Sequence, residues 1–137
     1  MPPVIADSGF LVALGIRRDP RHGAAKAFLA RYKGEIIVPA PVVVESCFFF
    51  STAAKISLLD WLSKSPVTVA EVPPEAHPEI GLILTRYASL DPDFADAAIV
   101  WLADQIGCRA IVTVDKRDFG VYRLKGGKRF EIVRWFA

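Results

Sequence analysis

Short, continuously apolar runs alternate along the chain with longer segments in which apolar residues recur at helical spacing. Five apolar runs of strand length predict buried strands, at residues 4–6, 36–38, 67–70, 110–114 and 130–135. The segments between them predict helices, at about residues 8–15, 21–33, 39–54, 55–64, 75–89 and 93–106. Prolines and glycines fall at the expected boundaries, with Gly34 and Gly107 following two of the helices.

This alternation predicts an α/β fold. We expect a three-layer α/β/α sandwich around a mainly parallel central sheet of about five strands, because continuous apolar strands are typical of sheets covered by helices on both faces. No repeat or linker interrupts the pattern, so residues 1–137 are expected to form a single domain. In such sheets, ligands bind beyond the carboxyl ends of the strands.

Composition narrows the class of protein. Hydrophobic residues make up 53% of the 137 positions and the net charge is only +2, which excludes a disordered chain. No charged leader precedes the first apolar run, and residues 36–54 contain Pro39, Pro41 and Glu45, so no secretory signal or membrane span is expected. Cys47 and Cys108 lack metal-site spacing, and we expect two buried thiols in a reduced, cytoplasmic protein.

Charge is unevenly distributed along the chain. Residues 17–33 and residues 109–137 each carry a net charge of +5, whereas residues 34–108 carry −7. Two basic segments around an acidic middle could border a site for a polyanion. An ordinary solvated surface would give the same numbers, so charge alone does not decide between them.

Four carboxylates stand out by their positions. Asp7 and Asp115 each follow a predicted strand, at the edge where such folds bind ligands. Glu45 and Asp96 each interrupt an apolar helix that is expected to be largely buried, where an unpaired carboxylate is costly. Asp93 lies one turn before Asp96, on the same helix face.

Each of these acids alone is best explained as a helix cap or a locally satisfied carboxylate, but all four together would need a cation. Oxygen ligands with water and a substrate phosphate suit Mg²⁺ or Mn²⁺. Zinc is not expected, because His22 and His77 lie in unrelated segments and are interpreted as surface residues. A carboxylate-rich site of this kind suggests phosphodiester hydrolysis.

The same residues carry a resemblance to a known family. The apolar run ending in Asp7-Ser8, the helical Glu45, the Phe94-Ala95-Asp96-Ala97-Ala98-Ile99 segment and the Thr113-Val114-Asp115-Lys116-Arg117-Asp118-Phe119 segment resemble, in order, the four acidic motifs of PIN-domain ribonucleases. The last segment is the most specific match. The chain is most similar to the VapC toxins of bacterial and archaeal toxin–antitoxin pairs, over essentially its whole length.

The resemblance implies a PIN-like fold and Mg²⁺- or Mn²⁺-dependent endoribonuclease activity, with a small antitoxin as partner. It makes Asp7, Glu45, Asp96 and Asp115 the acidic quartet that binds the metal, with Glu45 a direct ligand or a partner through water. Supporting roles are expected for Ser8, Asp93, Thr113 and Asp118.

Further expectations concern surfaces and partners. Basic residues near the last motif are candidates to hold the RNA backbone, namely Lys116, Arg117, Arg123, Lys125, Lys128 and Arg129. The Phe48-Phe49-Phe50 cluster is interpreted as mostly core, and part of it, with Leu58, Leu59 and Trp61, as a candidate homodimer or antitoxin surface. Trp101 and Trp135 are expected in the core or at its edge.

Two enzymatic alternatives fit less well. A phosphatase of the haloacid dehalogenase type needs a second aspartate two residues after the first, where this chain has Gly9. A receiver domain needs an aspartate after a middle strand and a lysine after a later one, and neither is convincingly placed. A non-catalytic module that binds RNA or protein stays open as the alternative function.

Overall fold

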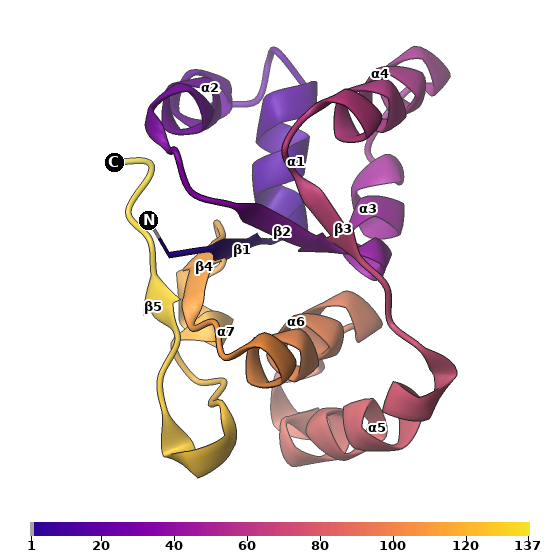
Figure 1. The fold of residues 1–137 in the computed structure, drawn as a ribbon, viewed down its shortest axis with the longest axis vertical. Helices are drawn as coiled ribbons and strands as arrows, with labels where there is room; N and C mark the ends of the chain where they lie inside the picture. The colour runs from indigo at the N-terminus through magenta and orange to yellow at the C-terminus, as the bar shows by residue number, and fades with distance from the viewer. Residues whose placement is uncertain (1) are drawn as a thin grey trace.

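The central element of the fold is a five-stranded sheet in which every neighbouring pair is parallel (Figure 1). The computed structural model describes residues 2–137. The strands lie in the order β3-β2-β1-β4-β5. Their bounds are Val4–Ala6 for β1, Ile36–Pro39 for β2, Thr68–Ala70 for β3, Ala110–Val112 for β4 and Glu131–Ile132 for β5.

Helices cover both faces of this sheet, which confirms the predicted three-layer α/β/α architecture (Figure 1). On one face lie α1 (Ser8–Gly15), α2 (His22–Arg31), α3 (Ala40–Cys47) and α4 (Thr52–Lys64). On the other lie α5 (His77–Arg86), α6 (Phe94–Ile106) and the one-turn α7 (Lys116–Phe119). Three short 3₁₀ turns, at Pro74–Ala76, Ala88–Leu90 and Lys125–Gly127, join these elements.

The strand order creates a switch point between β1 and β4. The chain builds outward from β1 through β2 to β3, then returns to the other side of β1 with β4 and β5. The pairing of Ile5 with Ile37 on one side and with Ile111 on the other fixes this arrangement. Connections that leave neighbouring strands in opposite directions open a crevice at the carboxyl edge, which is where such sheets bind ligands.

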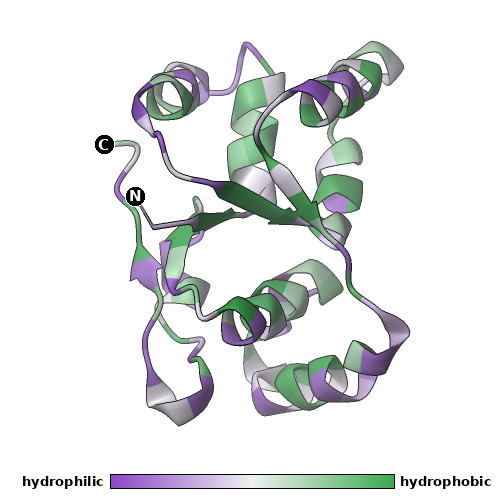
Figure 2. Cartoon of the chain, in the orientation of Figure 1, coloured by the Kyte–Doolittle hydropathy of each residue, from purple (hydrophilic) through white to green (hydrophobic). Residues whose placement is uncertain are grey.

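The core confirms the hydrophobic pattern in β1, β2 and the inner helices, whereas β3, predicted as buried, has Thr68 and Val69 exposed because it lies at the edge of the sheet. Every residue of β1 and β2 is buried, as expected for strands covered on both faces, and Figure 2 shows the strands as hydrophobic through the middle of the molecule. Trp101 and Trp135 are buried, as predicted. No helix within residues 2–137 has the length and apolar character needed to cross a membrane.

The predicted helix at 39–54 is wrong in its extent. Helix α3 ends at Cys47, and a turn precedes α4, whose first turn is capped by Ser51 accepting a hydrogen bond from the Ala54 backbone N–H at 3.2 Å. Phe48 and Phe49 are 80% and 64% exposed, so only Phe50 of this cluster belongs to the core. The prediction failed because the apolar run continues past the end of α3, and the only local sign of a new helix is the capping residue Ser51.

His22 and Cys47 also differ from the expectations about their burial. His22 is half-buried, and its Nδ1 lies 2.8 Å from the carbonyl oxygen of Ala13, so it ties α2 to α1 rather than facing solvent. Cys47 is only partly buried, whereas Cys108 is buried as expected.

The two strands at the carboxyl-terminal end are shorter than predicted. Strand β4 stops at Val112, and the hydroxyl of the next residue, Thr113, donates a hydrogen bond to the Asp7 carboxylate. Helix α7 was not predicted, and it begins directly after Asp115, which caps it. Strand β5 covers only Glu131–Ile132, and the segment after it crosses toward α2 (Figure 1).

Candidate active site at the carboxyl edge of the sheet

Asp7 lies at the end of β1, on the floor of the crevice, and is only 5% exposed. Its Oδ1 accepts a hydrogen bond from the Ser8 backbone N–H at 2.7 Å, and its Oδ2 accepts one from the Thr113 hydroxyl at 2.9 Å. Burial raises its pKa to about 6, although both hydrogen bonds oppose this shift, and the charges of Asp93 and Asp115 raise it further. Asp7 is therefore held in a fixed orientation, and its ionised form is disfavoured by burial.

Thr113 and Asp115 bring the end of β4 to the same place. The buried Thr113 hydroxyl donates to Asp7 and accepts a hydrogen bond from the Asp115 backbone N–H at 2.9 Å, so one side chain joins two strand ends. The Asp115 Oδ1 in turn accepts from the Asp118 backbone N–H at 3.0 Å and caps α7. Asp115 is half-buried.

The start of α6 supplies the third part of the site. Asp93 is the N-cap residue, and its Oδ1 accepts a hydrogen bond from the Asp96 backbone N–H at 2.8 Å. Asp96 is half-buried in the first turn. Burial raises its pKa to about 8, and the charges of Asp7, Asp93 and Glu45 add to the shift.

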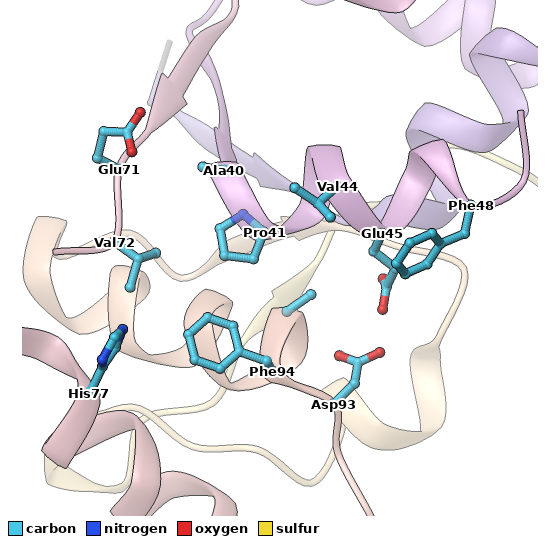
Figure 3. Close-up of a pocket in the computed structure, with 11 residues that line it drawn as sticks. Ala40, Pro41, Val44, Glu45, Phe48, Glu71, Val72, His77, Asp93 and Phe94 are labelled. Carbon is cyan, nitrogen blue, oxygen red and sulfur yellow. The ribbon is translucent and has the colours of Figure 1, made fainter. Parts of the chain in front are cut away.

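Glu45 comes from α3 on the other side of the crevice. Its carboxylate faces that of Asp93 (Figure 3). Burial raises its pKa to about 7, with further increases from hydrogen bonding to Asp93 and from the charges of Asp93 and Asp7. The expectation that this helix is largely buried is wrong, because Val44 is 59% exposed and Glu45 itself only half-buried.

The structure brings the four sequence-predicted acids to one cleft of about 360 Å³. Its lining includes Asp7, Glu45, Asp93, Asp96 and Asp115, together with Ser8. No ion pair found within residues 2–137 involves any of these acids. Their mutual repulsion is therefore relieved by protonation or by a cation from outside the chain.

The donor set fits a hard divalent cation. Every side chain in the set offers oxygen, and both histidines lie outside the cleft lining. Across residues 2–137, no three acidic, histidine or cysteine side chains are arranged closely enough to hold a metal ion directly. An ion bound here would therefore keep part of its water shell, as Mg²⁺ commonly does when held by one or two protein carboxylates.

The basic residues expected to contact RNA have different surroundings. Lys116 and Arg117 are exposed at the start of α7, next to the cleft. The Arg123 guanidinium donates to the carbonyl oxygens of Gly120, Val121 and Tyr122, so it holds its own loop. Lys125 forms an ion pair with Glu79 at 2.6 Å. Lys128 lines a different depression, and Arg129 is exposed on the same loop.

Sequence reasoning missed two residues that line the cleft, Asp19 and Arg21, in the turn between α1 and α2. It also missed the role of Trp135, whose indole N–H donates to the Thr113 carbonyl oxygen at 3.0 Å and so supports the residue that joins Asp7 to Asp115. The only local signal was the basic character of residues 17–33. The contacts themselves join parts of the chain that are far apart in sequence.

Comparison with known proteins identifies the family of this chain. Residues 4–124 match the PIN domain family. The chain belongs to the PIN-domain family. Ribonuclease VapC26 of Mycobacterium tuberculosis is 28% identical to this PIN domain over 134 residues, which span 95% of this chain and 99% of that protein. The crystal structure of VapC20 from the same organism, a toxin that cleaves the sarcin–ricin loop, matches with a TM-score of 0.75 at 20% identity. That match covers 83% of this chain and 91% of VapC20.

Proposed function

We propose that this PIN domain is a Mg²⁺- or Mn²⁺-dependent endoribonuclease and the toxin of a toxin–antitoxin pair. One observation carries the proposal: Asp7, Glu45, Asp96 and Asp115 converge on one cleft and form no ion pair within residues 2–137, and burial and mutual charge raise the pKa of the first three. A site that needs a cation, in a family that includes ribonucleases, supports metal-dependent RNA cleavage.

The roles of the acids follow from their hydrogen bonds. Asp7, Asp96 and Asp115 would hold the ion, in part through its bound water, and Glu45 would bind it directly or through water. Asp7 and Asp115 are oriented by Ser8, Thr113 and the first turn of α7, so their positions do not depend on the ion. When bound, the metal would lower the pKa of a water and polarise the scissile phosphate.

The supporting residues position the acids and the substrate. Thr113 fixes the distance between the ends of β1 and β4, and Asp93 holds the first turn of α6 while facing Glu45. Asp118 contributes its backbone N–H to Asp115. Lys116 and Arg117 are the predicted RNA contacts that best fit this role, because Arg123 and Lys125 are engaged within the fold.

A separate groove is suited to the antitoxin. It has a volume of about 410 Å³, lies between α1, α2 and α4, and combines an apolar floor with basic residues, namely Leu11, Leu14, Leu29, Leu58, Trp61, Arg17 and Lys26. We assign it to an antitoxin segment that presents apolar and acidic side chains. We also propose that the chain is cytoplasmic, where RNA and an antitoxin would be present.

A homodimer is proposed from the exposed apolar residues on and after α3. Val44, Phe48 and Phe49 are more than half exposed, and Phe48 with Phe94 borders an apolar groove of about 480 Å³ beside Glu45 (Figure 3). Exposed aromatic residues of this kind are enriched at protein interfaces. Sedimentation equilibrium of the full chain, compared with Phe48→Ser, tests this assignment: a dimer that dissociates in the variant supports it, and a wild-type monomer contradicts it.

Cleavage of an RNA panel by the purified chain tests the enzymatic function. We expect cleavage with Mg²⁺ or Mn²⁺, and none with EDTA or in Asp96→Asn. Binding of RNA without cleavage under any divalent metal would instead favour the non-catalytic binding module.

A further inference from the structure

We propose that Phe136 positions Arg21 and Lys116 to bind an RNA phosphate beside the acidic cleft. The Arg21 guanidinium carbon lies 4.5 Å from the centre of the Phe136 ring, and the Lys116 Nζ lies 4.6 Å from the same centre. Three segments that are remote in sequence thus meet at one point. The inference rests on the proposed ribonuclease function and assigns it a substrate contact.

Arg21 has donors available for a ligand. It lines the cleft with Asp7 and Asp115, and its Nε is buried without a hydrogen-bond partner among residues 2–137. The ion pairs of the described chain do not include it. Because a buried donor without an acceptor is costly, this side chain is suited to an acceptor that arrives with the substrate. A phosphate matches the planar fork of a guanidinium.

The backbone around Arg21 is held in place. Its N–H donates to the Asp19 Oδ1 at 2.8 Å, and the neighbouring His22 is tied to the Ala13 carbonyl oxygen. The position of the Arg21 guanidinium therefore depends on its side chain alone. A long, flexible side chain loses entropy when it binds, and a ring that holds it in place beforehand reduces that loss.

Phe136 is suited to hold both cations because it is itself anchored. Its ring packs edge to face on the neighbouring Trp135, with the centroids 4.8 Å apart. Trp135 is buried against Phe10 and donates its indole N–H to Thr113. The cation-binding ring is thus linked rigidly to the residue that orients Asp7.

Electrostatics explains why two cations held beside the cleft would help RNA to bind. The acidic cleft repels the RNA backbone, and Lys116 directly follows Asp115 at its rim. Two cations against one aromatic ring place positive charge where the substrate must approach. Cation–π contacts persist in solvent, so the arrangement does not require an acidic partner that would compete with phosphate.

RNA binding at several salt concentrations tests the proposal. The full chain carrying Asp96→Asn is used as the parent, in EDTA, with a fluorescein-labelled pool of short single-stranded RNAs read by anisotropy. We expect Phe136→Leu to raise Kd by about three- to ten-fold and Phe136→Tyr to restore parental binding. Arg21→Ala should raise Kd and reduce the steepness of the salt dependence by about 0.7.

The matched control is Arg31→Ala, at the last residue of α2, the helix that Arg21 directly precedes. Arg31 also lies over an aromatic ring, 5.2 Å from the centre of Phe28, but it does not line the cleft. We expect its Kd to stay close to that of the parent. Combining Arg21→Ala with Phe136→Leu should weaken binding by less than the product of the single effects, because both changes disrupt one contact.

The outcomes separate this inference from the proposed function. The inference is overturned if Phe136→Leu binds RNA as tightly as the parent, or if Arg21→Ala shows the same salt dependence as Arg31→Ala. In either case, wild-type cleavage with Mg²⁺ would still support the proposed function. A wild-type chain that neither binds nor cleaves RNA overturns both. If Phe136→Leu does not fold, as judged by circular dichroism, Arg21→Ala and Lys116→Ala still decide, because unchanged binding in both contradicts the proposal.

Discussion

The acidic side chains of the cleft come from the ends of β1 and β4, from α3 and from the start of α6, and three of them also serve as helix caps. Asp7, Asp93 and Asp115 each use one carboxylate oxygen on a backbone N–H at the start of α1, α6 and α7. The interpretation of these acids as caps and the interpretation as metal ligands are therefore compatible. A carboxylate has about four lone-pair sites, so a hydrogen bond that orients the side chain leaves acceptor capacity for a cation.

Asp96→Asn should separate activity from stability. We expect cleavage to fall by about 100-fold or more, because a proposed metal ligand is lost. Without metal at about pH 8, the free energy of unfolding of the variant, measured in urea, should exceed that of the wild type by about 1–2 kcal/mol. This value allows for solvent screening at the half-buried carboxyl. Asp104→Asn on the same helix is the control, since Asp104 accepts a hydrogen bond from Lys125 outside the cleft. A fully active Asp96→Asn would remove this residue from the mechanism.

Thr113→Val should weaken the junction between the two strand ends. The change leaves the Asp7 Oδ2 and the Asp115 backbone N–H without their partner, and we expect a loss of about 1–3 kcal/mol in urea unfolding. Thr85→Val, which removes an exposed hydroxyl bonded to the Gly81 carbonyl, should change stability far less. Equal effects of the two substitutions would argue against a structural role for the Thr113 hydroxyl.

At the scale of elements, the apolar strands and the acids at their ends could be predicted from the sequence. Strand β1 and its terminal Asp7 are adjacent in the chain, and the parallel arrangement then places Asp115 nearby. The turn between α3 and α4 could not be predicted from apolar spacing, since Phe48 and Phe49 look like core residues until their neighbours are known. Contacts such as Arg21 with Phe136 have no local signal.

The N-terminus of α6 offers a test at this scale. Asp93→Asn keeps an oxygen acceptor for the Asp96 N–H, whereas Asp93→Ala removes it and should cost about 1 kcal/mol. Both variants remove a charge that raises the pKa values of Asp96 and Glu45, so both pKa values should fall. Carboxyl carbon NMR titration measures this, and unchanged pKa values would show that the three acids are not electrostatically coupled.

At the scale of the whole molecule, the acidic cleft should make stability depend on pH. Asp7, Glu45 and Asp96 have pKa values raised in the folded state, so the folded chain binds more protons than the unfolded chain between about pH 4 and pH 8. Their contribution to stability is complete at low pH and is lost as the pH rises through the folded-state values. For the buried Asp7 alone, the loss is about 3 kcal/mol.

Urea unfolding across this range, in EDTA, measures that loss. We expect the pH dependence between about pH 5 and pH 8 to be flatter in Asp96→Asn than in the wild type, because one of the shifted groups is removed. Identical slopes would mean that Asp96 ionises as freely in the folded chain as in the unfolded one. The control Asp104→Asn should leave the slope unchanged.

Calorimetric titration of Mn²⁺ into the full chain near pH 7, in two buffers of different ionisation enthalpy, tests the central claim most directly. The claim is that separate carboxylates form one pocket that a divalent cation neutralises. We expect saturable binding with release of protons from the acids whose pKa values are raised, and loss of both in Asp96→Asn. No saturable binding at millimolar Mn²⁺, or binding that Asp96→Asn leaves unchanged, would contradict the account.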